Sequence, residues 1–218
     1  MAGAAQRLSD IRARISRAAA LARRQPDAIT LIAVTKGREA SEIEPLIEAG
    51  HRDFGESRVQ EALAKWPPLL ARRPGIRLHG IGRLQSNKAR EAVQLFDVIH
   101  SLDRASLLDA LADAAAREGR SPSLYVQVNI GDEPQKGGCP ITELGALVDL
   151  VRASPLPLAG LMAIPPLDVE PAPFFALLAK LARRHGVAGL SMGMSADYEA
   201  AVMLGATTVR VGSALFED

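Results

Sequence analysis

Short apolar runs alternate with longer amphipathic segments along almost the whole chain. Residues 4–24 place apolar side chains at helical spacing with arginines between them, which predicts an amphipathic helix. An apolar run at residues 29–35 predicts the first strand, after which helices and strands alternate. The later predicted helices cover residues 41–49, 57–65, 86–95, 104–118, 141–153, 171–185 and 196–204, and the later strands cover residues 51–55, 77–81, 97–101, 124–130, 157–163, 188–191 and 207–211.

This alternation predicts the fold class. Strands joined by helical crossovers are parallel, and their nearly continuous apolar runs suit a sheet that is covered on both faces. Eight such strands predict a closed (β/α)8 barrel. Few residues follow the last strand, so we expect the N-terminal helix to take the place of the usual last helix. Residues 1–218 are expected to form a single domain, and an open doubly wound sheet is the alternative.

Local signals set one helix boundary. Ser41 is a candidate N-cap of the second predicted helix, and Gly50 is expected just beyond its end. No G-x-G-x-x-G motif follows the first strand, which argues against a dinucleotide-binding form of the open sheet.

Composition narrows the functional classes. The chain is 48% hydrophobic and 23% charged, as globular proteins are. Its formal net charge of +1 provides no bulk attraction to nucleic acid or to an anionic membrane. Aromatic residues, at 4%, are too scarce to suggest base stacking. No apolar stretch reaches the roughly 20 residues of a membrane span. We therefore expect neither a nucleic-acid partner nor a membrane partner.

The cysteine and histidine content bears on location and metal binding. Cys139 is the single cysteine and the N-terminus lacks an apolar signal segment, so a cytoplasmic protein is expected. The four histidines show no metal-ligand spacing with Cys, Asp or Glu, so no metal is expected.

Lys36 follows the first predicted strand directly, where a barrel would place it at the mouth. An amine that is partly desolvated there loses proton affinity and becomes a nucleophile toward aldehydes, which suggests Schiff-base chemistry. An ordinary strand-end lysine that reaches solvent is the other interpretation.

The loops after the last two predicted strands contain glycine and serine. Ser195 opens the helix after the seventh strand, and Gly212 and Ser213 follow the eighth. Backbone N–H groups at a helix start, together with hydroxyls, can bind a phosphate, and these loops often do so in barrels. Glycine and serine also serve turns and caps, so that interpretation stays open. Arg210 lies in an apolar strand and must find a partner.

Residues 79–90 form a basic, glycine-containing stretch without acidic side chains. It is either an ordinary loop and solvated helix, or a segment that closes over a ligand or attracts an anion at the barrel mouth.

Motifs spread over nearly the whole chain resemble those of the pyridoxal phosphate homeostasis protein family. They are AVTKG (33–37), DFGESRVQE (53–61), HGIGRLQSNK (79–88), QVNIGDEPQKGG (127–138), GLMAIPP (160–166), LSMGMSADYEAA (190–201) and VRVGSALF (209–216). The combination of IGxLQxNK and SMGMSxD is specific. The resemblance implies a barrel similar to the N-terminal domain of alanine racemase that binds pyridoxal 5′-phosphate (PLP).

The resemblance also implies roles for individual residues. Lys36 would form the Schiff base with PLP. Ser195, Gly212 and Ser213 would hold the phosphate, and Arg210 would face the pyridine nitrogen.

The implied function is intracellular PLP homeostasis without catalytic turnover. Enzymes that lack their PLP are the implied recipients, and a monomer is expected. A PLP-dependent amino-acid racemase is the alternative, and an aldolase-type barrel that uses Lys36 without PLP ranks below it. Tyr125 is expected at the end of its strand far from the mouth, and Tyr198 in the helix after the SMGMS loop, so neither supplies the second base that racemisation needs.

Three positions depart from the family pattern. Ser57 and Arg58 stand where the FGENY motif has asparagine and tyrosine, which puts any polar contact from this loop to the cofactor in doubt. Gly80 follows His79 where the family usually has an aromatic residue.

Overall fold

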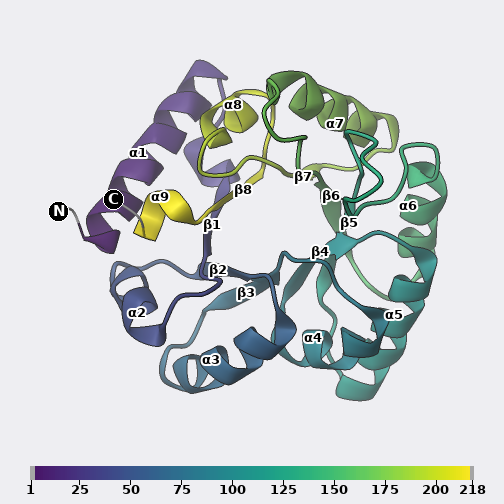
Figure 1. Ribbon diagram of the computed structural model, residues 1–218, viewed down its shortest axis with the longest axis horizontal. Helices are drawn as coiled ribbons and strands as arrows, with labels where there is room; N and C mark the ends of the chain where they lie inside the picture. The colour runs from purple at the N-terminus through teal and green to yellow at the C-terminus, as the bar shows by residue number, and fades with distance from the viewer. Residues whose placement is uncertain (1–2, 217–218) are drawn as a thin grey trace.

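The computed structural model describes residues 3–216, in which eight parallel strands close into a barrel (Figure 1). Neighbouring strands follow the order of the chain, and β1 pairs with β8 to close the sheet. The strands are β1 (Thr30–Val34), β2 (Asp53–Glu56), β3 (Arg77–Gly80), β4 (Val98–Leu102), β5 (Ser123–Gln127), β6 (Leu158–Met162), β7 (Gly189–Ser191) and β8 (Thr208–Val211). The closure confirms the predicted barrel and excludes the open sheet.

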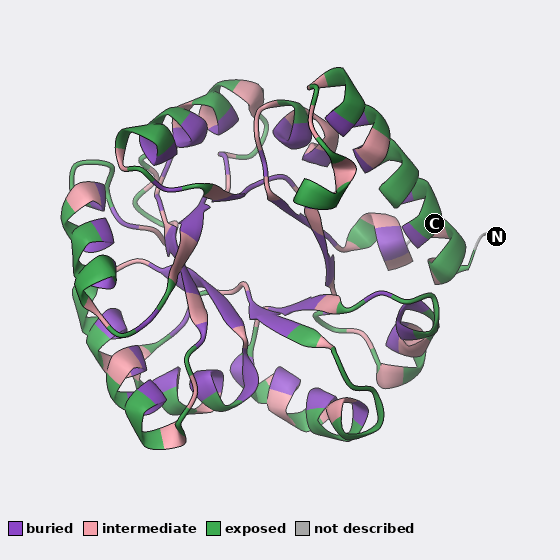
Figure 2. Cartoon of the chain, turned by 180° about the vertical axis from the view of Figure 1, so that it is seen from behind, coloured by how far each residue is buried: buried purple, intermediate pink, exposed green. Residues whose placement is uncertain are grey.

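The helices form a ring around the barrel and turn their buried faces toward it (Figure 2). The α-helices are α1 (Ala4–Leu21), α2 (Ala40–Glu48), α3 (Val59–Arg72), α4 (Ala89–Leu95), α5 (Ala105–Glu118), α6 (Leu144–Ala153), α7 (Ala172–Arg184), α8 (Tyr198–Met203) and α9 (Ser213–Phe216). Two short 3-10 helices, η1 (Pro26–Ala28) and η2 (Ser86–Lys88), precede β1 and α4. The main apolar core lies between strands and helices.

The N-terminal helix occupies the position of an eighth outer helix, as predicted. Helix α1 packs against α8, α2 and the short α9, and it buries Leu8, Ile11 and Ile15 (Figure 1). This apolar stripe covers the barrel beside β8 and β1. The four-residue α9 was not predicted, because a single turn is too short to show a periodic pattern.

Most element ends lie within a few residues of the prediction, and two of the differences have a clear physical reason. Helix α3 continues to Arg72 through Pro67 and Pro68, although the prediction ended it at residue 65. The two prolines remove backbone donors, but Trp66 and Leu69 are fully buried, and burial of such side chains contributes about 1.5–3 kcal/mol each. Tertiary packing therefore outweighs the helix-breaking tendency of the prolines.

The second boundary is the start of α2. Glu39, not Ser41, is its N-cap, and Glu39 and Glu42 form a reciprocal capping box. Gly50 does follow the helix end, with a φ of +81° that favours glycine.

The interior of the barrel is unusually polar. Fully or almost fully buried polar side chains point into it from several strands, and they include His79, His100, Ser191, Thr208 and Arg210. Buried polar groups of this kind require partners. The arrangement of these partners defines the candidate site.

Candidate functional site

Lys36 lies at the mouth of the barrel, two residues after the end of β1. Its side chain is exposed and takes part in no hydrogen bond or ion pair with the described residues. The expectation of partial desolvation is therefore wrong, because the β1–α2 loop leaves the amine open to solvent. The amine is accessible to a small molecule that enters the mouth.

Two side chains of α3 hold the loop that carries Lys36. The Lys65 ammonium donates to the carbonyl oxygens of Thr35 (2.7 Å) and Arg38 (3.0 Å). The Glu61 carboxylate accepts a hydrogen bond of 2.5 Å from the backbone N–H of Gly37. These contacts fix both sides of Lys36, so the backbone below the amine is rigid while the amine itself is free.

The Glu56 carboxylate is buried between β2 and α3 and holds this arrangement in place. Its Oε1 atom accepts hydrogen bonds from Thr35 Oγ1 (2.7 Å) and Trp66 Nε1 (2.8 Å), and it lies 2.9 Å from the Lys65 ammonium. Glu56 is fully buried, and the side chain of Lys65 is 9% exposed. Sequence reasoning missed this buried ion pair, although the DFGESRVQE motif contains Glu56.

We expect the substitution Lys65→Met to destabilise the fold by about 3 kcal/mol, because it leaves the buried Glu56 carboxylate without its countercharge. The measurement is the free energy of unfolding in urea. Lys88→Met is the matched control: Lys88 pairs with Glu91 at 3.0 Å, but both side chains are one-third exposed. The control should cost less than about 1 kcal/mol. Equal losses in the two variants would contradict a special role for Lys65.

The loops after β7 and β8 meet at Ser195. Its Oγ atom accepts hydrogen bonds from the backbone N–H groups of Gly212 (3.2 Å) and Ala214 (3.4 Å). Gly212 also packs closely on β1, since a Cβ atom there would lie 3.3 Å from Val34 Cβ. The structure thus brings Ser195, Gly212 and Ser213 together, as the sequence analysis required of a phosphate site.

The loop after β7 differs in one respect from the prediction. Helix α8 begins at Tyr198, whereas residues 195–197 form a turn in which Asp197 Oδ1 accepts from the Met194 N–H (2.6 Å). Within residues 3–216, the N–H groups of Ser195, Ala196 and Ser213 have no acceptor. Free N–H groups and hydroxyls on two facing loops suit a phosphate, although the donors belong to turns and not to the start of a long helix.

Gly193 makes this turn possible. Its φ is +92°, and a Cβ atom would lie 2.5 Å from Ala201 Cβ. Any larger residue would push the turn away from α8 and from the loop after β8.

Arg210 points into the barrel from β8 and is 4% exposed. Its Nη1 donates to Ser191 Oγ (2.6 Å), and its Nη2 donates to the carbonyl oxygen of Ala163 (3.1 Å). Burial lowers the pKa of Arg210 to about 10, which still leaves the guanidinium protonated at neutral pH. The guanidinium has more donor hydrogens than these two bonds use, so it can also donate to a ligand acceptor.

Tyr125 does not lie where the sequence predicted, and neither Tyr125 nor Tyr198 is exposed. Tyr125 is the middle residue of β5, where it stacks on His100 with ring centroids 4.4 Å apart and its hydroxyl lies 3.2 Å from Thr208 Oγ1. The prediction put Tyr125 too near the start because β5 ends at Gln127 and not at residue 130. Tyr198 does lie in α8, as predicted, and the Arg14 guanidinium covers its ring from α1.

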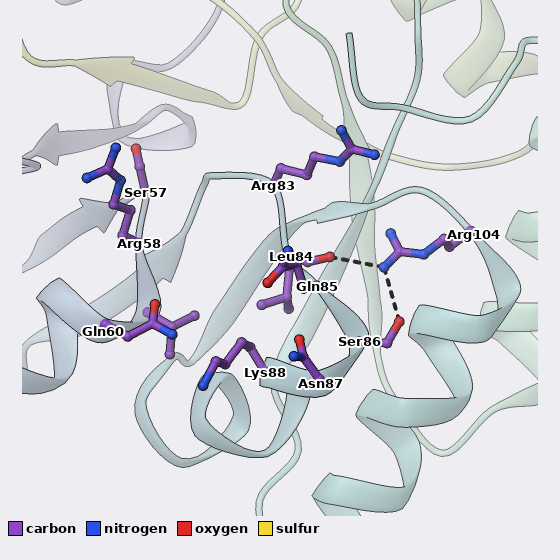
Figure 3. A pocket seen from close by; sticks show the side chains of 11 residues that line it. Ser57, Arg58, Gln60, Arg83, Leu84, Gln85, Ser86, Asn87, Lys88 and Arg104 are labelled. Atoms are coloured by element: carbon purple, nitrogen blue, oxygen red, sulfur yellow. Dashed lines mark hydrogen bonds between the residues drawn. The ribbon is translucent and has the colours of Figure 1, made fainter. Parts of the chain in front are cut away.

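A separate basic pocket of about 570 Å³ opens beside the loops after β2 and β3 (Figure 3). Its cationic side chains are Arg58, Arg83, Lys88 and Arg104, and no acidic residue lines it. In Figure 3, Arg104 lies on one side, where it donates to the Leu84 carbonyl and the Ser86 hydroxyl, and Ser57 and Arg58 lie on the other. The departures at positions 57 and 58 thus contribute to this pocket.

Close packing explains the presence of glycine at position 80. A Cβ atom at this position would lie 2.7 Å from Cδ2 of Phe96, so the glycine lets the Phe96 ring pack directly on β3. The Phe96 ring occupies the space that a side chain at residue 80 would need, which accounts for the absence of a large side chain there.

Within residues 3–216, no group of three or more His, Cys, Asp or Glu side chains is arranged to bind a metal ion. None of the helices in this range has the length and apolar character that crossing a membrane requires.

Comparison with known proteins decides the family. The sequence matches the alanine racemase N-terminal domain family over residues 7–218. The chain belongs to this family. The pyridoxal phosphate homeostasis protein of Pseudomonas aeruginosa is 42% identical to it over 224 residues, which cover 99% of this chain and 96% of that protein. The protein of the same name from Escherichia coli K12 is 39% identical, covering 97% and 95%. These relatives confirm the resemblance that the motifs predicted.

Solved structures of the family agree with the fold. PipY of Synechococcus elongatus, solved with PLP bound, is 39% identical to this chain and has a TM-score of 0.84. The match covers 98% of this chain and 99% of the PipY chain. Its structure without PLP gives a TM-score of 0.85. An alanine racemase from Streptomyces lavendulae is 22% identical to this chain and has a TM-score of 0.69. The match covers 95% of this chain but only 56% of the racemase. The racemase likeness concerns the fold alone.

Proposed function

We propose that this protein binds PLP as a Schiff base on Lys36 and takes part in PLP homeostasis. The observation that carries the proposal is the pair of loops at Ser195 and Gly212, whose free N–H groups and hydroxyls face the same mouth as the exposed Lys36 amine. The relatives named for PLP homeostasis and the PLP-bound PipY support the choice of ligand.

The family resemblance, together with the position of each site residue, supports one role for each of them. Condensation of the Lys36 amine with the PLP aldehyde forms a C=N bond and releases the carbonyl oxygen as water. Ser195, Gly212 and Ser213 bind the phosphate through hydroxyl and backbone donors. Arg210 donates to the pyridine nitrogen. A guanidinium stays protonated, so that nitrogen remains an acceptor without a proton of its own, and the ring withdraws electrons less strongly.

We propose that the protein stores or delivers PLP and does not turn over amino acids. Racemisation needs an acid/base group on each face of the substrate Cα atom. Lys36 can supply one of them. The hydroxyl of Tyr125 is engaged inside the barrel, and Tyr198 lies under Arg14 between α8 and α1. A PLP-dependent racemase is the alternative function.

Enzymes that lack PLP are the proposed recipients, and the proposed form is a cytoplasmic, single-domain monomer of residues 1–218.

Incubation of the PLP-loaded protein with L-alanine in deuterated water tests this proposal. Loading should produce a visible absorption band, and we expect no protein-dependent exchange of the Cα proton and no D-alanine, measured by NMR and chiral chromatography. A loaded alanine racemase serves as the positive control. Exchange that disappears in Lys36→Ala would replace storage by racemase activity as the function, and absence of the band would refute PLP binding.

A further inference from the structure

A continuous chain of hydrogen bonds crosses the barrel interior from its base to Arg210. Asp53, at the start of β2, contacts His79 Nε2 through Oδ1 (3.0 Å), and His79 Nδ1 lies 3.0 Å from His100 Nε2. His100 Nδ1 lies 2.9 Å from Ser191 Oγ, which accepts from Arg210. His79, His100 and Ser191 are each at most 3% exposed. The chain therefore joins β2, β3, β4, β7 and β8 without contact with solvent between its ends.

The two ends of the chain determine the direction of every hydrogen bond. Arg210 can only donate, so Ser191 Oγ accepts from it, and the Ser191 hydroxyl hydrogen remains available to donate to His100 Nδ1. His100 then carries its proton on Nε2 and donates to His79 Nδ1. His79 in turn carries its proton on Nε2 and donates to the Asp53 carboxylate. The opposite direction would place an unprotonated His79 nitrogen against a carboxylate oxygen, or require a charged imidazole in the interior.

The protonation states agree with this direction. Burial lowers the pKa of His79 and lowers that of His100 well below its ordinary value, so both rings are neutral at pH 7. Burial disfavours the charged form of Asp53. The hydrogen bonds from His79 and Arg77 outweigh this effect, so the pKa of Asp53 lies below its ordinary value. A carboxylate thus terminates the chain at the base.

Within residues 3–216, no carboxylate is a hydrogen-bond partner of the Arg210 guanidinium. We propose that Asp53, His79, His100 and Ser191 are positioning residues, which orient the Arg210 guanidinium at the mouth through this one-directional chain. The proposal rests on the proposed function for its effect on PLP, since Arg210 is the residue placed against the pyridine nitrogen. Asp53 would then influence ligand binding although it lies at the opposite end of the barrel.

The first test uses the protein without PLP. Long-range 1H–15N NMR of the histidine side chains should show His79 and His100 as neutral Nε2–H tautomers. In Asp53→Ala the terminal acceptor is lost, so the His100 signals should shift toward a mixture of tautomers. Asp97→Ala is the matched control, because Asp97 is a carboxylate at the same end of the barrel that binds Leu78 N–H and Arg120 instead. An unchanged His100 tautomer in Asp53→Ala would overturn the proposal.

The second test measures PLP affinity in a double-mutant cycle. Asp53→Ala should weaken PLP binding roughly three- to tenfold in the otherwise unaltered protein, but less than about twofold in a His100→Phe background, where the chain is already broken. Phenylalanine keeps an aromatic ring against Tyr125, and Ser191→Ala is the second background if His100→Phe does not fold. Equal effects of Asp53→Ala in both backgrounds would refute the coupling. If the unaltered protein fails to bind PLP, the proposed function is refuted, whereas the NMR test still decides the chain.

Discussion

Replacement of Lys36 by alanine should abolish the covalent PLP adduct. Borohydride reduces a Schiff base to a stable secondary amine, so the unaltered protein should retain PLP after reduction and denaturation, with the modified peptide containing Lys36. Lys36 is the exposed amine at the end of β1, and its loop is fixed by Lys65 and Glu61. Mass spectrometry of the reduced, digested protein measures the result.

The control for this experiment is Lys88→Ala. Lys88 lies in the basic pocket beside the neighbouring loops and binds Glu91, so its removal should leave the adduct on Lys36 intact. A reduced adduct found mainly on Lys88 or Lys136 of the unaltered protein would show that the assignment to Lys36 is wrong.

Removal of the phosphate contacts should produce the second large effect. Ser195→Ala is expected to weaken PLP affinity roughly tenfold or more, because a hydrogen bond to a charged group contributes about 1.5–3 kcal/mol. The Ser195 hydroxyl also accepts hydrogen bonds from the backbone N–H groups of Gly212 and Ala214, so the substitution should also displace these two residues. Titration followed by absorbance measures the dissociation constants.

Pyridoxal, which has the aldehyde but not the phosphate, is the matched ligand control. It should bind the unaltered protein much more weakly than PLP, and Ser195→Ala should affect its affinity little. Equal affinities of the unaltered protein for pyridoxal and PLP would contradict a phosphate site on these loops.

The barrel could be predicted because its elements have strong periodic patterns. Each of the eight predicted strands is present, with ends displaced by a few residues. The prediction failed where tertiary packing decides: α3 passes through Pro67 and Pro68 because Trp66 and Leu69 are buried on either side of them. The position of Tyr125 was wrong for a related reason, since β5 stops where Val128 forms a bridge to Cys139.

The site was only partly predictable. The barrel rule and the family resemblance selected Lys36 after β1, Ser195 after β7 and Arg210 within β8. The partners of these residues lie far apart in sequence: His100 and Ser191 are 91 residues apart, and a strand pattern does not show which polar side chains meet inside the barrel. The Glu56–Lys65 pair joins a strand to a helix face, so no single periodicity reveals it.

The packing of α1 against α8 and α9 has a consequence for synthesis on the ribosome. Lys36 and the first helix emerge early, but β1 must wait for β8 as its neighbour, and α1 must wait for α8 and α9. The loops at Ser195 and Gly212 are also made long after Lys36. If Lys36 and these loops bind PLP as proposed, a nascent chain exposes the Lys36 amine before the phosphate loops exist, and it can capture the ligand only after α1 and β1 have joined α8, α9 and β8.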